Sequence, residues 1–321
     1  MKAAVIREFG PVENFEIVDL PRPKPGFREV LVKVIATSVN PLDFQVRRGD
    51  YKNELVLPVI TGNDVSGEIV ELGEGIENFK VGDEVYYTPE IFKGQGSYAQ
   101  YHVAHESIIG FKPKNISHLE AATLPLAAGT AYEMLVTRAQ LKINQSILIH
   151  GGAGGVGIPT IQIAKAMGAT VFTTARKVHH EFLKELGADY VIDYENENYL
   201  DAILTLTDNK GVDVVIDTLG GNTLSDSGKI LSQLGQVVTL VDTEKPQNLI
   251  AAWGKNATYH FVFTRQSRNK MEELTKLVEN KKLKPVLNKV YPLSEIGKAH
   301  SLLETRIGDE NFYGKIGIDM Q

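Results

Sequence analysis

Cysteine is absent from the 321 residues of this chain. Disulfide bonds, thiolate metal sites and cysteine nucleophiles are therefore excluded. Long apolar runs are absent too, and the first ten residues, MKAAVIREFG, lack the apolar stretch of a signal peptide. We therefore expect a cytoplasmic protein that does not enter a membrane.

An excess of positive charge is also lacking, because the net charge is −6. This balance argues against broad binding to nucleic acids or anionic membranes. Hydrophobic residues make up 43% and charged residues 23%, as in ordinary soluble globular proteins. The length suggests about two domains.

The first third of the chain resembles a series of short β-strands. Alternating Val30, Val32 and Val34 predict a strand over residues 29–38 with one buried face. Further strands are expected at 3–6, 15–20, 66–72, 84–87 and 97–103. This pattern is typical of a partly open β-barrel or a folded sheet. Ser117 and Glu120 then form a capping box that opens a helix, which Pro125 and Gly129 interrupt and residues 130–138 resume.

A glycine-rich turn, GGAGGVG at 151–157, separates an apolar strand from a helix. Gly152, Gly154 and Gly157 fit the G-x-G-x-x-G spacing, with Gly155 and Val156 between them. The first glycine can take positive φ, the second lets a pyrophosphate approach, and the third lets the helix pack closely on the strand. The anion would lie at the helix N-terminus. The pattern predicts a dinucleotide site, and the alternative is a glycine loop without a ligand.

Strands and helices alternate from residue 146 onward. Strands are expected at 146–150, 170–174, 190–193, 212–217, 236–240 and 259–263, and helices at 156–167, 178–186, 197–207 and 222–234. This alternation predicts a doubly wound parallel sheet with ligands beyond the carboxyl ends of the strands. Leu219, which follows one of these strands, would then flank the cofactor.

After Phe263 the alternation stops. A helix at 267–282, a strand at 286–291, a helix at 294–304 and a strand at 314–320 lack a sheet of their own. We therefore expect the chain to return to its first domain. The predicted organisation is α/β, with a cofactor domain at 123–266 inserted into a catalytic domain formed by 1–122 and 267–321, and a cleft between them.

The sequence after the second predicted strand of the cofactor domain indicates which nucleotide is bound. No acidic residue occurs from Gly151 to His180, although an NAD site needs one for the ribose 2′-hydroxyl. Thr174 stands in its place, and Arg176 and Lys177 follow. A hydroxyl and a guanidinium suit a 2′-phosphate, so the sequence favours NADPH. Alternatively, the two cations are solvated residues at the start of a helix. Tyr194 could also bond to this phosphate or lie at the surface.

Several motifs together resemble the zinc-free quinone oxidoreductase branch of the medium-chain dehydrogenases/reductases. The motifs are NPLD at 40–43, residues 47–51, GNDVSGEIV at 62–70, VGDEV at 81–85, GSYAQY at 96–101, LP at 124–125, GTAY at 129–132 and HGGAGGVG at 150–157. The resemblance runs almost end to end. It implies a GroES-like catalytic domain, a Rossmann domain, NADPH, a quinone or α,β-unsaturated carbonyl substrate, and a homodimer.

The resemblance also implies roles for single residues. Asn40 and Tyr51 match polar positions of the active cleft, and Asp43 would orient its neighbours, although it could equally be a helix cap. Thr130 matches a position beside the nicotinamide, or is a helix cap. Lys315 is a further candidate for cofactor binding.

The chain departs from the zinc alcohol dehydrogenases at their metal ligands. Gly62-Asn63-Asp64 replaces their Gly-His-Glu, and their cysteine ligands are missing. We expect Asn63 and Asp64 to bond only to each other. His102 and His105 have a metal-like spacing but follow a predicted edge strand, so we interpret both as surface residues and expect no metal.

Without a metal to stabilise an alkoxide, conjugate reduction is favoured over alcohol oxidation. A few hydrogen-bond donors at the carbonyl oxygen would suffice. The alternatives are a zinc-independent alcohol dehydrogenase or ketone reductase, and an NADPH-binding redox sensor without turnover. RNA binding lacks a basic and aromatic stripe. The segment from Tyr86 to Gly96 could line a pocket or be a surface loop.

Overall fold

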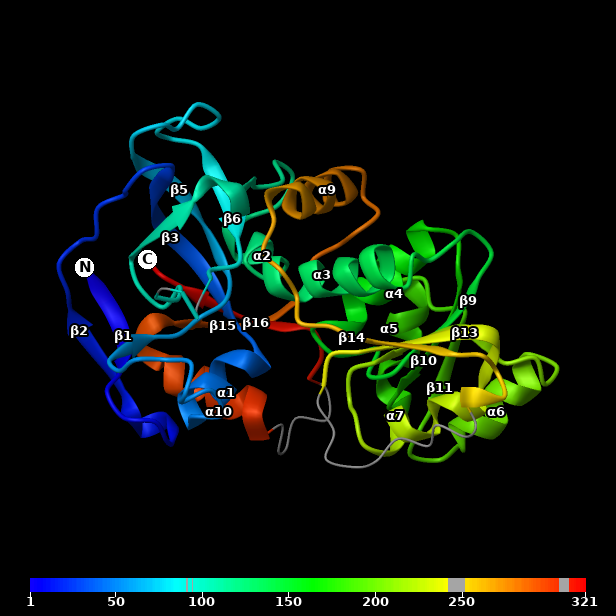
Figure 1. Ribbon diagram of the computed structural model, residues 1–321. Coiled ribbons are helices and arrows are strands. Elements are labelled where there is room, and N and C mark those ends of the chain that lie inside the picture. Colours follow the sequence, from blue (N-terminus) through cyan, green and yellow to red (C-terminus); the bar gives the residue numbers. More distant parts are fainter. Residues whose placement is uncertain (91, 94, 242–251, 306–311) are drawn as a thin grey trace. The chain divides into compact units, whose positions relative to one another are not determined.

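The computed structural model describes residues 1–90, 92–93, 95–241, 252–305 and 312–321 (Figure 1). It divides into two compact units. The first comprises Met1–Gly129, Gln266–Lys281 and Pro285–Gln321, and the second comprises Thr130–Arg265 and Lys282–Lys284. The assignment of catalysis to the first and of cofactor binding to the second stays a prediction.

The first unit is built on two sheets. One has the order β2-β1-β4 and the other β15-β16-β3-β5-β6-β8, with β7 also paired to β3. Their strands are β1 (Lys2–Ile6), β2 (Phe15–Asp19), β3 (Glu29–Val39), β4 (Val59–Ile60), β5 (Val65–Leu72), β6 (Glu84–Tyr87), β7 (Tyr101–His105), β8 (Gly110–Phe111), β15 (Leu287–Pro292) and β16 (Lys315–Asp319). The prediction that β3 has one buried face is wrong, because Leu31 is as fully buried as Val30 and Val32. β3 pairs along its edges with β5, β7 and β16, and the helices α2 (His118–Ala121) and α10 (Ile296–Thr305) also contact it.

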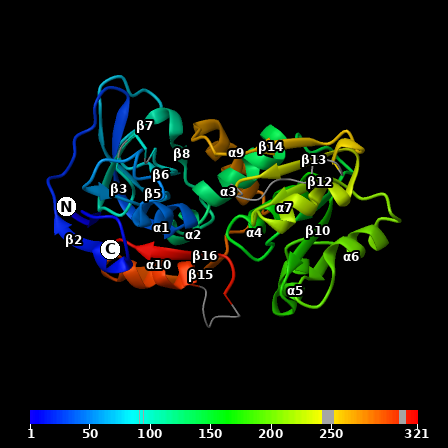
Figure 2. The same cartoon turned by 60° about the horizontal axis from the view of Figure 1, so that its bottom comes forward.

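The C-terminal segment returns to this sheet, as the sequence predicts. β16 runs antiparallel to β3, with Ile316 opposite Val39, and β15 runs parallel to β16. This register brings Lys315 beside Asn40, which directly follows β3. Figure 2 shows β15, β16 and the helix α10 (Ile296–Thr305) in orange and red beside the helix α1 (Pro41–Arg48).

Short helices fill the connections of the first unit. They are η1 (Val12–Asn14), α1 (Pro41–Arg48), η2 (Glu106–Ile108), α2 (His118–Ala121), α3 (Pro125–Tyr132), α9 (Arg268–Glu279), η6 (Leu293–Glu295) and α10 (Ile296–Thr305). The capping box of Ser117 and Glu120 is confirmed. The helix is interrupted before Pro125, as predicted, because α2 ends at Ala121 and Pro125 begins α3, where proline is tolerated in a first turn. The predicted interruption at Gly129 is wrong, because Gly129 lies within α3. The π-helix η3 (Glu133–Arg138) follows α3 directly.

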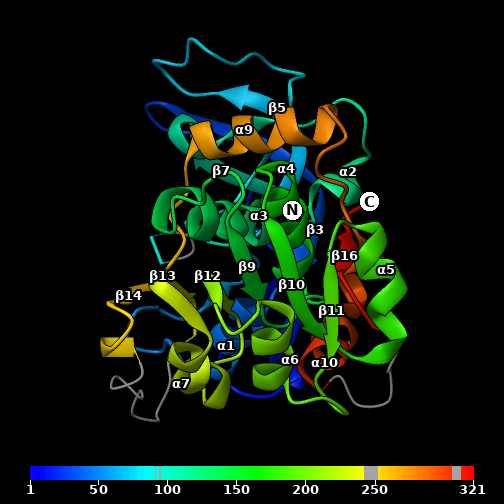
Figure 3. The same ribbon diagram turned by 90° about the vertical axis from the view of Figure 1, so that its right-hand side faces the viewer.

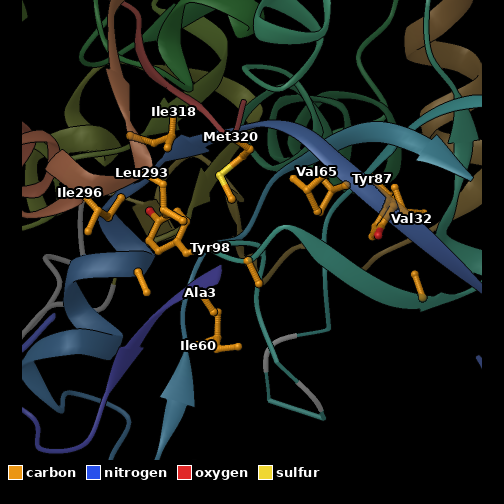
Figure 4. Close-up of a cluster of buried hydrophobic side chains, with 14 of the residues drawn as sticks. Ala3, Val32, Ile60, Val65, Tyr87, Tyr98, Leu293, Ile296, Ile318 and Met320 are labelled. Atoms are coloured by element: carbon orange, nitrogen blue, oxygen red, sulfur yellow. The ribbon is translucent and has the colours of Figure 1, made fainter. Parts of the chain in front are cut away.

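The core of the first unit joins residues from both ends of the chain. Ala3, Ile60 and Tyr98 pack together with Leu293 and Met320 (Figure 4). The hydroxyls of Tyr87 and Tyr98 are polar groups within this apolar cluster, and each therefore needs a hydrogen-bond partner.

The second unit is a parallel sheet in the order β11-β10-β9-β12-β13-β14, which Figure 3 shows strand by strand. Its strands are β9 (Ser146–Ile149), β10 (Thr170–Ala175), β11 (Tyr190–Asp193), β12 (Val212–Asp217), β13 (Leu231–Thr239) and β14 (Thr258–Phe261). Its helices are α4 (Gly157–Ala166), η4 (Lys177–His179), α5 (His180–Glu185), α6 (Tyr199–Leu206), α7 (Asn222–Asp226) and η5 (Ser227–Lys229). The order reverses beside β9, as in a doubly wound nucleotide-binding sheet, and the predicted Rossmann fold is confirmed.

One predicted helix of this unit is too long. Helical structure was expected over 222–234, but it ends at Lys229 and β13 begins at Leu231. The β13 residues pair with β12, and this pairing outweighs the helical periodicity of the local sequence.

Candidate active site

A buried cluster of polar side chains lies where β3 ends in the first unit. Asn40 caps α1, Asp43 lies in its first turn, Asn63 and Asp64 precede β5, and Lys315 begins β16. All five are at most 6% exposed. Buried polar groups are costly unless they are bonded to one another, so their partners define what the cluster can do.

Asp64 is the acceptor at the centre of this cluster. Its carboxylate accepts hydrogen bonds from the Ser38 hydroxyl, from Asn40 Nδ2 at 2.7 Å and from the Leu126 backbone N–H at 2.8 Å. The prediction that Asn63 and Asp64 bond only to each other is wrong. Asn63 donates instead to Asp43 Oδ1 at 2.6 Å.

Lys315 places a buried cation in this cluster. Its Nζ donates to the Val39 carbonyl at 3.0 Å and to Asn40 Oδ1, and lies 3.4 Å from Asp64 Oδ2. Burial lowers the pKa of Lys315, while the nearby carboxylates of Asp64 and Asp43 oppose that shift. The ammonium therefore neutralises negative charge inside the first unit. Cofactor binding by Lys315 stays a prediction.

Asp43 combines the two roles that the sequence left open. Its Oδ2 accepts from the Asn40 backbone N–H at 2.7 Å, which caps α1, and from the Tyr98 hydroxyl at 3.1 Å. Burial raises the pKa of Asp43 to about 6, against the opposing hydrogen bond from Asn63. Tyr98 also lies 3.1 Å from His300 Nε2. Asp43 is thus a helix cap and a carboxyl group that titrates near neutral pH.

The three predicted catalytic residues are not all brought together by hydrogen bonds. Tyr51 lies in the turn after α1, and its ring centroid is 5.3 Å from that of Phe92. Burial raises the pKa of Tyr51, so its hydroxyl stays protonated at neutral pH and can donate. Within the described residues, no hydrogen bond joins Tyr51 to Asn40 or Asp43. The amide of Asn40 already faces Asp64 and, at 3.5 Å, Asp43.

His102 corrects another expectation. It is buried in β7, where Nδ1 lies 2.8 Å from the Tyr87 hydroxyl and Nε2 lies 2.8 Å from the Gln95 carbonyl oxygen. Burial lowers its pKa to about 4. The interpretation of His102 as a surface residue is therefore wrong, and its ring is a neutral part of the core. Side-chain packing buries the ring, since it lies against that of Tyr87 with the two ring centroids 5.6 Å apart.

The segment from Tyr86 to Gly96 also begins inside the fold. Tyr86 ends in the core of β6, and its hydroxyl donates to the Met271 carbonyl at 2.7 Å. The strand predicted at 84–87 is thus confirmed as β6, and it supplies the first two residues of this segment. Residues 91 and 94 lie outside the described part of the chain.

The glycine turn of the second unit joins β9 to α4 by close backbone contacts. Gly151, at φ +75°, makes the tight turn that the sequence assigned to Gly152. A Cβ on Gly152 would lie 2.1 Å from Thr173 Oγ1, and one on Gly157 would lie 2.2 Å from the Gly151 carbonyl oxygen. These two glycines therefore serve close packing of the turn. A Cβ on Gly154 would meet only the Gly151 oxygen, at 3.2 Å, so this position faces open space.

The start of α4 fits a pyrophosphate. Among the described residues, no acceptor bonds the N–H groups of Gly155 and Val156, which precede the helix. Free N–H groups at a helix N-terminus form an anion site. Leu219 lies over the turn, since its Cδ2 would be 3.5 Å from a Cβ on Gly151. The turn therefore fits the diphosphate of a dinucleotide.

Of the residues predicted to bind a 2′-phosphate, Thr174 lies within β10, Arg176 and Lys177 follow it, and Tyr194 follows β11. Thr174 is buried, and its hydroxyl oxygen accepts from the Gly151 N–H at 3.3 Å. Arg176 interacts with the Tyr194 hydroxyl, and its Nε lies 2.9 Å from Glu195 Oε1. Lys177 is exposed at the start of η4. Glu195 was not predicted from the sequence as a residue of this site, although it directly follows Tyr194, which was.

Thr130 lies inside α3 and is buried. The alternative interpretation of Thr130 as a helix cap is therefore wrong, since α3 begins five residues earlier, at Pro125. Its predicted place beside the nicotinamide stays a prediction.

Comparison with known proteins identifies the family. Residues 26–140 match the alcohol dehydrogenase GroES-like domain, and residues 186–307 match the zinc-binding dehydrogenase family. The chain is 37% identical to 2-methylene-furan-3-one reductase from Solanum lycopersicum, over 95% of this chain and 76% of that protein. The chain belongs to the zinc-free, quinone oxidoreductase-like medium-chain dehydrogenases/reductases.

Two further members of this oxidoreductase family agree with the assignment. The chain is 36% identical to the chloroplastic NADPH-dependent alkenal/one oxidoreductase of Arabidopsis thaliana, over 95% of this chain and 77% of that protein. The structure of the quinone oxidoreductase from Coxiella burnetii superposes with a TM-score of 0.90 at 35% identity, covering 100% of this chain and 99% of that one. The family is one of nicotinamide nucleotide-dependent enzymes.

The zinc in the name of the matched family does not fit the site of this member. The cluster offers Asn63 and Asp64 in place of the His and Glu of the zinc enzymes, and the Lys315 ammonium lies against Asp64. Across the described ranges, no group of three or more His, Asp or Glu side chains could hold a metal ion. None of the helices in those ranges is long and apolar enough to cross a membrane.

Proposed function

We propose that this chain uses NADPH to reduce quinones or α,β-unsaturated carbonyl compounds. The observation that carries the proposal is the buried cluster in which Asn63 stands where a zinc dehydrogenase has an imidazole ligand and the Lys315 ammonium lies against Asp64. A protein without a metal at this site lacks the usual means of stabilising an alkoxide. The printed names of its relatives, an alkenal/one oxidoreductase and a quinone oxidoreductase, support the same substrate class.

NADPH is favoured by the environment of the predicted 2′-phosphate. Arg176 and Lys177 offer two cations directly after β10, and Thr174, near the end of β10, stands in place of the carboxylate of an NAD site. Tyr194 adds a hydroxyl at Arg176. The free N–H groups of Gly155 and Val156 suit the diphosphate.

The chemistry needs little from the protein beyond binding and hydrogen bonding. NADPH, when bound, supplies the hydride. The β-carbon of the substrate accepts it, negative charge develops on the carbonyl oxygen, and a proton from water then adds to the α-carbon. For a quinone, the same two electrons and two hydrogen nuclei give a hydroquinone.

Tyr51 is the proposed donor to the carbonyl oxygen. Its hydroxyl stays protonated at neutral pH, and one such donor contributes a factor of about 10²–10³ to turnover. The sequence predicts that Asn40 also donates directly to the carbonyl oxygen of the substrate. Its bonds to Asp64 and Lys315 support a positioning role instead, together with Asp43.

The test is a panel of acceptors with purified protein and either NADPH or NADH. The panel contains 9,10-phenanthrenequinone, a 2-alkenal and the matching saturated ketone. We expect oxidation of NADPH, followed at 340 nm, with the quinone or the alkenal and little with the ketone. Equal rates with the saturated ketone would favour a ketone reductase. Tight NADPH binding without any turnover would favour a redox sensor.

We also propose that the protein is a cytoplasmic homodimer. Support for a dimer comes from Phe261, which is 64% exposed on β14 at the edge of the parallel sheet. An edge strand that carries an exposed apolar residue offers a surface that a second copy of the chain would cover. Light scattering coupled to gel filtration would give the mass, and cell fractionation would test the location.

A further inference from the structure

Glu195 lies within the group of residues that we assign to the 2′-phosphate. Its Oε1 is 2.9 Å from the Nε of Arg176, and both side chains are roughly half exposed. The parallel register pairs Ala175 with Asp193, so Arg176 and the residues after Asp193 leave the sheet at the same edge. A carboxylate therefore stands beside the guanidinium expected to hold a dianion.

The turn that carries Glu195 is well defined. The Asp193 carboxylate accepts from the Glu195 N–H at 3.3 Å and from Asn196 Nδ2 at 2.9 Å. The Asp193 carbonyl accepts from the N–H groups of Asn196 and Glu197. Glu195 is therefore presented to Arg176 by an ordered backbone, and the contact does not depend on a long unsupported loop.

The contact uses only part of the guanidinium. Arginine has five N–H donors in a planar fork, and Glu195 occupies the one on Nε. This ion pair does not use the donors on the two Nη atoms, although the guanidinium also bonds to the Tyr194 hydroxyl. A phosphate can thus bind Arg176 while Glu195 stays close to it. The two anions then repel each other.

We infer that Glu195 is a specificity-determining residue that weakens the binding of the 2′-phosphate and so limits the preference for NADPH over NADH. This inference rests on the proposed use of NADPH. With Glu195 ionised, the cations of Arg176 and Lys177 are partly neutralised before the cofactor arrives. Removal of that one charge leaves the guanidinium in place and increases its net attraction for the phosphate.

Glu195→Gln tests the inference, because an amide oxygen can still accept from Nε while the charge is lost. Binding of adenosine 2′,5′-bisphosphate and of 5′-AMP is measured by calorimetry for the wild type and the variant. We expect the variant to bind the bisphosphate about three- to tenfold more tightly, as one charge in a partly screened site allows, and to bind 5′-AMP unchanged. The gain should shrink at high salt.

Glu181→Gln is the matched control. Glu181 forms an exposed ion pair with Lys184 on α5, so the substitution changes the net charge equally without touching Arg176. It should leave the affinity for both nucleotides unchanged. An equal gain in this control would show that only overall charge matters and would overturn the inference.

The outcomes separate the inference from the proposed function. A wild type that binds the two nucleotides equally would contradict the assignment of NADPH, and the inference with it. A wild type that prefers the bisphosphate, combined with unchanged or weaker binding by Glu195→Gln, would overturn the inference alone. Weaker binding would show that Glu195 orients Arg176. Melting temperatures of both variants verify that the fold is retained.

Discussion

Replacement of Lys315 by methionine should destabilise the protein strongly. Methionine fills a similar volume but removes the cation that lies 3.4 Å from Asp64 Oδ2 in a buried site. The Asp64 carboxylate would then keep its hydrogen bonds but lose its opposite charge. Breaking a buried ion pair by removing one partner costs about 3–5 kcal/mol. We expect a loss of that size in the free energy of unfolding.

A surface lysine provides the matched control. Lys165 lies only 2.6 Å from Asp189, but this pair is substantially exposed. Exposed pairs contribute about 0–1 kcal/mol, so Lys165→Met should cost much less despite the shorter distance. Urea unfolding followed by circular dichroism gives both values. Equal losses for the two variants would mean that burial does not determine the energy of the Lys315 pair.

A double-mutant cycle isolates the interaction itself. Lys315→Met and Asp64→Asn are measured singly and together. Because the double variant has neither buried charge, its loss should be smaller than the sum of the single losses by more than 1 kcal/mol. Additivity within about 0.5 kcal/mol would refute the assignment of Lys315 as the counter-ion of Asp64.

Three further predictions concern the pH dependence, the chemistry and the cofactor. Burial raises the pKa of Asp43 from its ordinary 3.8 to about 6. The protonated carboxyl therefore contributes about 3 kcal/mol to the free energy of unfolding below pH 4, and this contribution is lost as the pH rises through 6. Asp43→Asn should remove this slope from urea midpoints measured between pH 4 and 7.5, and an unchanged slope would contradict it. Tyr51→Phe should lower kcat/KM for enones by about 10²-fold with unchanged NADPH affinity, and full activity would exclude Tyr51 as the donor. Gly154→Ala should keep the melting temperature but weaken NADPH binding by about 10- to 100-fold, whereas Gly297→Ala should leave binding unchanged.

The sequence was sufficient for features that depend on neighbouring residues. The glycine turn, the capping box of Ser117 and Glu120, and the alternation of strands and helices after Ser146 all have local causes. Their predictions were correct because a turn needs residues without a Cβ, and a helix start needs a side-chain acceptor, wherever the segment lies in the fold.

The sequence was insufficient where the partner comes from a distant strand. Lys315 and Asn40 are 275 positions apart and meet only because β16 pairs with β3 in one register. A shift of one residue would turn Lys315 to the opposite face of the sheet. Neither residue type indicates this partner. His102 was misplaced for the same reason, since its partners, the Tyr87 hydroxyl and the Gln95 carbonyl, come from β6 and from the segment before β7.

The buried cluster around Asp64 and the group formed by the glycine turn and Arg176 differ in whether their positive groups are already paired within the protein. This difference connects fold to function. In the first unit, the charge of Lys315 is used up inside the protein on Asp64 and the Asn40 amide, so the cluster fixes the end of β3 instead of binding a ligand directly. In the second unit, the N–H groups of Gly155 and Val156 precede α4 without an acceptor among the described residues, and Arg176 is only partly engaged by Glu195. Unsatisfied donors at an accessible position mark a binding site, while satisfied ones mark a scaffold. On this criterion the strongest evidence for a ligand is at the predicted dinucleotide site. The substrate assignment depends on Tyr51, whose hydroxyl is protonated and, within the described residues, makes no hydrogen bond to Asn40 or Asp43.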